Sequence, residues 1–409
     1  MGKSLDVLAF GAVTIEYISH VEKLPKPGEI VTGSYMETCF GGRAANQCVA
    51  AAKLGASTAL VAKVGKDKSG DEYLEYLENL SVEVKHIRQV KDCPTGMSEI
   101  AASEEGEFYT INVPGANASL SSKDVSNAKN AFKRAKVLLC QLETNMRLTT
   151  YALRQFKGFS ILHVSPLRPD IPDDLIKLPS ILVANELAAA QLADMEKVET
   201  LQQARQAAET ILSKGAKSVI ITMGDQGAVH MTKDKKDKAK NKDKATDKQE
   251  DKDKELVCTH VPAADVPNLA DRSGAGDAFV GSLAYHITRF PKLPREHHIA
   301  AAHSCAAQSM GKLGTQPSFP GKEGAKNDLC MTTPTYNVLR DEDPRDSSDS
   351  KPSPPPSPPP PAAVAEERSS ADPPPKQPSS ARETINEAPE EPEKKAKSKK
   401  KFGKSKLEE

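Results

Sequence analysis

Short apolar runs of strand length alternate with helical stretches through the middle of the chain. The apolar runs predict short buried strands, and the Ala-rich stretch 203–214 predicts one of the helices between them. The strand-like runs lie at residues 137–142, 160–164, 181–184 and 218–222. This alternation predicts an α/β fold, in which a parallel sheet is covered by helices on both faces.

Polar residues stand at the carboxyl ends of three of these predicted strands. They are Gln141 and Glu143 after the first run, Asn185 after the third and Thr222 at the end of the fourth. Ligands of open parallel sheets bind outside the carboxyl ends of the strands. We therefore expect these side chains to face a ligand.

A turn of small residues precedes an apolar helical pattern late in the chain. Gly274, Ala275 and Gly276 come directly before Asp277, and the apolar residues after it fall mostly on one helical face. Small residues let backbone N–H groups converge on an anion, and a helix N-terminus adds a positive dipole. An anion hole beside a carboxylate base is the minimal equipment for phosphoryl transfer to an alcohol. The alternative is an ordinary glycine-rich turn with Asp277 as a helix cap.

A second glycine turn lies near the N-terminus. Gly41-Gly42 runs into a small-residue stretch that Gly55 ends, and a strand-like run follows at 58–65. A Gly-Gly pair lets the backbone approach a small polar ligand closely. Asn46, on the first turn of this predicted helix, is placed to hydrogen-bond a hydroxyl group.

Composition indicates a soluble enzyme without a nucleic-acid or membrane partner. Lys+Arg and Asp+Glu both total 56, so there is no basic footprint for nucleic acid. The seven cysteines form no C-x-x-C pair, which argues against a zinc site or a disulfide framework and for a reducing compartment. The sequence shows no signal peptide and no apolar run long enough to span a membrane, so we expect a cytoplasmic protein.

Two segments depart from a compact domain, which we expect at residues 1–330. Residues of about 233–255 are mostly Lys, Asp and Glu, as in a solvated insertion at the tip of a hairpin. The tail 331–409 contains a proline run, which suits a Pro-binding module, and a basic cluster at 394–401, which suits a nuclear address. For both features we favour a solvated, disordered tail over these two functions.

These motifs together resemble the ribokinase-type (phosphofructokinase B) carbohydrate kinases. The Gly41-Gly42 segment is similar to that family's GGxxANQ element, and residues 271–277 are similar to its D-T-T-G-A-G-D element. Further matches occur in order, at 24–29 (LPxxGE), 114–117 (PGAN), 141–143 (QLE), 222–227 (TxGxxG) and 314–318 (GxQPS). The resemblance covers roughly residues 5–325. It implies a three-layer sandwich with a mostly parallel central sheet. It also implies a small β-sheet lid, at about 14–40 and 95–113, that closes over the sugar and pairs two subunits.

The resemblance also implies roles for individual residues. Asp277 would be the general base, and Gly274, Ala275 and Gly276 the anion hole. The sugar would be surrounded by Thr14, Glu16, Gly41, Gly42, Asn46 and Glu143. ATP, bound with Mg²⁺, would meet Asn185, Thr222, Met223, Gly224, Asp225, Gln226, Gly227, Gly276 and His303. A monovalent cation, K⁺, would lie among Asp271, Ser273, Ser309, Gly314 and Ser318.

The chain departs from the family pattern at several site positions. Arg272 stands next to the phosphate path, and Glu16 replaces the usual aspartate. Ala188 stands where the family's Asn-x-x-Glu has glutamate, with Glu186 close by. In addition, Ala44 replaces a glycine of the sugar motif, and His163-Val164-Ser165-Pro166 replaces Asn-Pro-Ala-Pro.

Three functions remain open on the sequence. The first is ATP-dependent phosphorylation of D-ribose at its 5-hydroxyl, giving D-ribose 5-phosphate. The second is phosphorylation of another sugar or a nucleoside. The third is a degenerate kinase fold that acts as a binding or scaffold protein. The retained base and anion hole favour a kinase.

Overall fold

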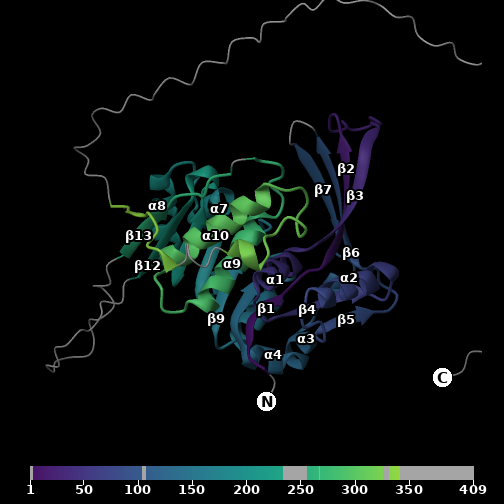
Figure 1. The fold of residues 1–409 in the computed structure, drawn as a ribbon, viewed down its shortest axis with the longest axis horizontal. Coiled ribbons are helices and arrows are strands. Elements are labelled where there is room, and N and C mark those ends of the chain that lie inside the picture. The colour runs from purple at the N-terminus through teal and green to yellow at the C-terminus, as the bar shows by residue number, and fades with distance from the viewer. Residues whose placement is uncertain (1–2, 104–106, 234–255, 267, 326–330, 341–409) are drawn as a thin grey trace, which may run out of the picture. The chain divides into compact units, whose positions relative to one another are not determined.

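A computed structural model describes residues 3–103, 107–233, 256–266, 268–325 and 331–340 of the chain. Most of the charged segment 233–255, and the tail beyond residue 340 with its proline run and basic cluster, lie outside the described residues. The described part contains a large sheet with helices on both faces and a separate small sheet (Figure 1). The expected α/β sandwich is thereby confirmed.

The large sheet has the strand order β14-β13-β12-β11-β10-β9-β8-β1-β4-β5. In this spatial order, the seven strands from β11 to the edge strand β5 are parallel to one another. The strands β12, β13 and β14 at the other edge are antiparallel to their neighbours. Its strands are β1 (Leu5–Phe10), β4 (Thr58–Gly65), β5 (Ile87–Val90), β8 (Ala135–Cys140), β9 (Phe159–His163), β10 (Ile181–Asn185), β11 (Ser218–Thr222), β12 (Ala228–Lys233), β13 (Leu256–Val261) and β14 (Asn337–Val338). Sheet structure thus extends beyond residue 330, since β14 pairs with β13.

Helices cover the large sheet on both sides. One face carries α3 (Ser122–Asn127), α4 (Lys129–Arg134), α5 (Met146–Gln155), α6 (Asp173–Lys177), α7 (Glu186–Ala193) and α8 (Leu201–Ser213). The other face carries α1 (Arg43–Leu54), α2 (Lys68–Asn79), α9 (Ala275–Arg289) and α10 (Arg295–Met310). Short 3₁₀ turns are η1 (Gly115–Ser119), η2 (Gly224–Gln226) and η3 (Lys322–Ala325).

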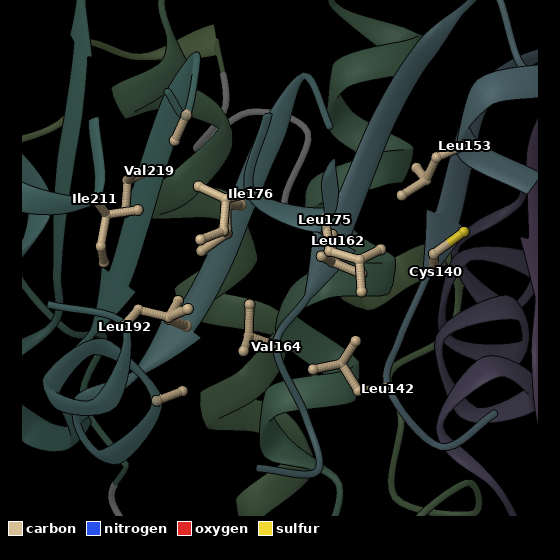
Figure 2. Close-up of a cluster of buried hydrophobic side chains, with 14 of the residues drawn as sticks. Cys140, Leu142, Leu153, Leu162, Val164, Leu175, Ile176, Leu192, Ile211 and Val219 are labelled. Carbon is tan, nitrogen blue, oxygen red and sulfur yellow. The ribbon is translucent and has the colours of Figure 1, made fainter. Parts of the chain in front are cut away.

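Alternating side chains of the buried strands build a separate core on each face. Leu138 and Cys140 of β8 pack with the α3–α8 layer, whereas Val137 and Leu139 pack with the α1–α9–α10 layer. Figure 2 shows the first of these cores, where Cys140, Leu162 and Val219 from three strands lie among leucines and isoleucines of the helices. Because both faces are covered, the apolar runs are nearly continuous, which is the pattern that predicts a parallel sheet.

The small sheet has the order β3-β2-β6-β7 and projects away from the helices (Figure 1). Its strands are β2 (Thr14–Val21), β3 (Gly33–Gly41), β6 (Gly96–Ser103) and β7 (Phe108–Val113), which match the segments expected to form the lid. The lid strands β2 and β3 run from Thr14 to Gly41, so one end of the lid lies at the start of α1. In the described part of the chain, no helix is long and apolar enough to cross a membrane.

Candidate active site

The site forms where the N-termini of α1 and α9 come together. Gly42 precedes α1 with φ of 89° and Gly274 precedes α9 with φ of 74°, a backbone region that favours glycine. The two helices pack closely because Gly281 has no side chain: a Cβ there would lie 2.6 Å from Ala50 Cβ and from the Gln47 carbonyl oxygen. This close approach brings the first turn of α1 within hydrogen-bond reach of Asp277.

Asp277 is 2% exposed, and two amides of α1 hold its carboxylate. Asn46 Nδ2 donates to Oδ2 at 3.0 Å, and Gln47 Nε2 donates to Oδ1 at 2.8 Å. His163 Nδ1 lies 3.7 Å from Asp277 Oδ1, too far to donate a hydrogen bond to it. Burial raises the pKa of Asp277, whereas the charge of Arg43 and the Asn46 hydrogen bond lower it, and the pKa lies below the ordinary value. Asp277 is therefore ionised at neutral pH and is able to accept a proton.

A second layer of hydrogen bonds fixes the amides around Asp277. Gln316 Nε2 donates to Asn46 Oδ1 at 2.8 Å, and the same nitrogen lies 2.7 Å from the Tyr73 hydroxyl. Tyr73 in turn donates to the Gly41 carbonyl at 2.7 Å. No role was expected for Gln47, Tyr73 or Gln316 from the sequence. Gln47 and Gln316 stand inside quoted motifs, GGxxANQ and GxQPS, which is the signal that would have found them.

The expected anion hole forms the first turn of α9. The amides of Gly276 and Asp277 have no hydrogen-bond acceptor among the described residues, as expected for the first N–H groups of a helix. Gly274 must lack a side chain, since a Cβ there would overlap Thr315. The turn therefore has two free amides where the sequence predicts an anion site, while the Ala275 N–H donates to the Arg272 carbonyl at 3.3 Å; anion binding here stays a prediction.

Glu16 and Glu143 approach Asp277 from β2 and from the segment after β8. Arg43 contacts Glu143 twice: its backbone N–H donates to Oε2 at 2.8 Å, and its Nε lies 3.6 Å from Oε1. Burial, together with the negative charge of Asp277, raises the pKa of each glutamate to about 7. The arrangement suits the hydroxyl groups of a sugar, which donate hydrogen bonds to carboxylates. Thr14 is buried nearby on β2, and Gly41 lies against Glu16.

The expected nucleotide residues lie around the carboxyl ends of β10 and β11. Asn185 pairs with Thr222 in the sheet register, and its side chain caps α7 by accepting from the Ala188 N–H at 2.9 Å. The η2 turn exposes Gly224, Asp225 and Gln226, whereas the side chain of Met223 is buried and offers a ligand only its backbone. Gly227, with φ of 94°, ends the turn.

Glu186 lies beside this nucleotide turn. Its Oε1 is 3.6 Å from the position that a Cβ on Gly224 would take, and burial with the charge of Asp225 raises its pKa. Ala188, which stands in the place of the family's glutamate, is 1% exposed. The carboxylate of Glu186, two residues before Ala188, therefore lies beside the η2 turn, although the family's glutamate is missing at position 188.

His303 lies on α10 and packs against the Phe279 ring, with centroids 5.1 Å apart. Burial, together with His260, lowers its pKa to about 4, and its Nε2 has no hydrogen-bond partner among the described residues. His260 also contacts the nucleotide turn, through Nε2 at 2.6 Å from the Gln226 carbonyl. His303 is thus a neutral ring close to one side of that turn.

The expected cation residues fall into two groups. Asp271 joins the loop before α9 to the loop at 314–318, because its carboxylate accepts from the Ser273 N–H at 2.7 Å and from the Gly314 N–H at 3.0 Å. Ser309 and Ser318 are buried and donate to local carbonyls. Over the described ranges, no cluster of three or more His, Cys, Asp or Glu is placed to hold a metal ion.

Comparisons with known proteins agree with this geometry. A family model for pfkB family carbohydrate kinases matches residues 4–322. Ribokinase of Mus musculus is 33% identical over 320 residues, covering 78% of this chain and 92% of the mouse protein. The structure of Thermotoga maritima ribokinase is similar with a TM-score of 0.66 at 26% identity, covering 80% of this chain and 100% of that one. The structure of Arabidopsis thaliana ribokinase with ribose and ATP has a TM-score of 0.67 at 23% identity, covering 81% and 100%.

Proposed function

The chain belongs to the pfkB family of carbohydrate kinases, and from that premise we propose that it transfers the γ-phosphoryl group of ATP to the 5-hydroxyl of D-ribose. The product is D-ribose 5-phosphate. The observation that carries the proposal is the buried, ionised Asp277, held by two amides at the N-terminus of a helix with free N–H groups. The likeness to mouse ribokinase supports ribose as the sugar.

In the proposed reaction Asp277 removes the proton of the attacking hydroxyl as the bond to phosphorus forms. The backbone amides at the start of α9 stabilise the negative charge on the phosphoryl group in transit. Glu16, Glu143 and Asn46 bind the other sugar hydroxyls. They hold the 5-hydroxyl against Asp277, which removes much of the entropic barrier of a two-substrate reaction.

The residues present suit ATP, Mg²⁺ and K⁺ as the remaining components. The η2 turn and Asn185 would hold the nucleotide, with the unpaired Nε2 of His303 next to it. Glu186 would orient water molecules around Mg²⁺, which would help to neutralise the charge of the phosphates. K⁺ would lie among Asp271, Ser273, Ser309, Gly314 and Ser318, where it would hold the anion-hole loop in place by charge; Asp271 already joins that loop to Gly314.

We also propose a homodimer that forms through the lid. Large apolar side chains are exposed on the two outer strands of this sheet, including Tyr35, Met36, Phe108, Tyr109 and Ile111. Exposed apolar groups gathered on one small sheet are typical of a protein interface. A cytoplasmic location remains our expectation. The tail features that suggest a nuclear address or a Pro-binding module lie outside the described residues.

The test is ATP consumption by the purified full chain with D-ribose, Mg²⁺ and K⁺, beside the Asp277→Asn variant. The proposal expects turnover that depends on ribose, is lost in the variant, and yields a product phosphorylated at the 5-position by NMR. If the enzyme turned over 2-deoxyribose, fructose or a nucleoside but not ribose, it would be a kinase with that compound as its substrate. ATP binding without turnover on any of these would contradict a kinase and favour a scaffold.

A further inference from the structure

His163 is the last residue of β9 and lies at the centre of the candidate site. In the sheet order, β9 stands between β8, which leads into Glu143 of the sugar pocket, and β10, which ends at Asn185 near the nucleotide turn. His163 is paired in register with Val183 of β10 and is 8% exposed. A phosphoryl group that passes from the nucleotide side to the sugar side must cross the end of this strand.

The hydrogen bonds of Gln47 determine which ring nitrogen of His163 carries the proton. The Gln47 atom that faces Asp277 Oδ1 at 2.8 Å must be the amide nitrogen, because an ionised carboxylate only accepts hydrogen bonds. The same nitrogen lies 3.0 Å from His163 Nδ1. Gln47 Oε1 accepts from Gln141 Nε2 at 2.6 Å, which fixes the amide in the same orientation. Gln47 therefore donates one hydrogen to Asp277 and the other to His163.

His163 Nδ1 is thus a hydrogen-bond acceptor, and the proton of the neutral ring is on Nε2. Nε2 lies 3.8 Å, and Cε1 3.5 Å, from the position that a Cβ on Gly276 would take. The ring edge that carries Nε2–H is therefore against the middle of the anion hole. Nε2 has no acceptor among the described residues, whereas Nδ1 is paired with Gln47.

We propose that His163 is a further catalytic residue, whose Nε2–H donates a hydrogen bond to the phosphoryl group as it passes from ATP to the sugar. The inference rests on the proposed kinase function. The proton stays on Nε2 throughout, because Asp277 takes the proton of the hydroxyl and the departing ADP takes up the charge of the broken bond. His163 adds a side-chain donor to the backbone amides of Gly276 and Asp277.

The first test compares His163→Ala, His163→Asn and, as a control, His86→Asn. His86 lies before the edge strand β5, where its Nε2 is 3.3 Å from Glu83. Removing a donor to a transition-state oxygen lowers kcat by roughly 10²–10³-fold. We expect such a loss for His163→Ala, with KM values for ATP and ribose within about twofold of wild type. His163→Asn, which keeps an N–H donor, should recover part of kcat, and His86→Asn should retain it.

The second test separates a direct contact from an effect through Asp277. The probe is ADP with Mg²⁺ and aluminium fluoride, which mimics the phosphoryl group in transit and needs no turnover. Its affinity should fall in His163→Ala by about the same factor as kcat, while the affinity for ADP alone stays unchanged. Most of this loss of probe affinity should remain when His163→Ala is added to Asp277→Asn. Because the two residues share Gln47, the double-mutant cycle measures how much of the effect passes through Asp277.

Three results would overturn the inference: kcat of His163→Ala within threefold of wild type, an equal loss of affinity for ADP alone, or no further loss of probe affinity in the Asp277→Asn background. The last would make His163 a positioning residue for Asp277. Failure of the proposed function looks different, since wild type would then consume no ATP with ribose while the probe measurement still reports on His163.

Discussion

The Glu16 carboxylate lies directly over Gly41, so closely that a Cβ on Gly41 would overlap it. Glu16 is one methylene longer than the aspartate usual in the family, and the missing side chain of Gly41 provides the space for it. The departure from the family pattern is therefore accommodated by the neighbouring strand, and it still places a carboxylate in the proposed sugar pocket.

Gly41→Ala should displace the Glu16 carboxylate and weaken sugar binding. We expect the KM for ribose to rise at least about tenfold, which corresponds to the loss of one hydrogen bond to a charged group, with a smaller effect on the KM for ATP. Steady-state kinetics with each substrate varied in turn would measure both. Gly321→Ala is the matched control, since a Cβ there has nothing within 4 Å. An unchanged ribose KM in Gly41→Ala would mean that Glu16 does not contact the sugar.

Asp277→Asn should lower kcat by roughly 10²–10⁴-fold, the range for loss of a general base. Asparagine keeps the shape of the side chain, so the dissociation constant of ribose, measured by calorimetry, should change little. Asp92→Asn is a suitable control, because Asp92 is exposed and its positive φ is one that asparagine adopts readily. Substantial remaining activity in Asp277→Asn would remove Asp277 from the role of base.

The raised pKa values of Glu16 and Glu143, about 7 each, predict a pH dependence of stability. In the unfolded chain a glutamate has a pKa of ~4.3. Between roughly pH 4 and 7 the folded protein binds more protons at these groups, so their contribution to the free energy of unfolding falls as the pH rises. Glu16→Gln removes one of them. We therefore expect the free energy of unfolding of Glu16→Gln, taken relative to that of wild type, to increase from about pH 5 to about pH 8. Urea unfolding at each pH would measure it.

Some groups contribute to the free energy of unfolding with the opposite pH dependence. Their contributions cancel when the variant is compared with wild type. Burial lowers the pKa of His298 and of His303 to about 4, so both histidines add stability as the pH rises through the acid range. Both are present in the two proteins. Glu75→Gln, at an exposed position of α2, is the control for the loss of one carboxylate. If the difference in the free energy of unfolding between Glu16→Gln and wild type did not vary with pH, the raised pKa of Glu16 would be contradicted.

Gly281→Val should separate α1 from α9. The new side chain would meet Ala50 and the Gln47 backbone, and overpacking of this kind costs about 1–3 kcal/mol of the free energy of unfolding. Because Asn46 and Gln47 would then move away from Asp277, kcat should fall more than the stability loss explains. Thermal melts and kinetics at a temperature where the variant is fully folded would separate the two. Normal kcat in a destabilised variant would show that the helix spacing does not set the geometry of the base.

The parts of the site that the sequence revealed lie at strand ends and glycine turns. The positions of Glu143, Asn185 and Thr222 at strand ends could be predicted because parallel strands place their carboxyl ends at one edge of the sheet, whereas their contacts with a ligand stay predictions. Gly274 and Asp277 were found because small residues before an apolar helical pattern are a local signal. In both cases the information lies within about ten residues of chain.

The contacts of Gln47 with His163 and of Asn46 with Gln316 were not predicted, because they join residues 116 and 270 positions apart. Such pairs depend on the register of β9 and on how closely α1 packs against α9, and neither leaves a local pattern. Glu186 is a similar case: only the fold of the η2 turn shows that it lies beside Gly224.

Gln47 has two amide hydrogens, and both are committed, one to Asp277 and one to His163. The proton acceptor and the proposed donor are therefore tied to a single nitrogen atom and cannot be adjusted separately. A descendant of this protein that changed residue 47 would have to rebuild both ends of the reaction at once, whereas the glutamates of the sugar pocket remain free to vary. Substitutions at Glu16 and Glu143, by contrast, remove neither hydrogen bond of the Gln47 amide nitrogen.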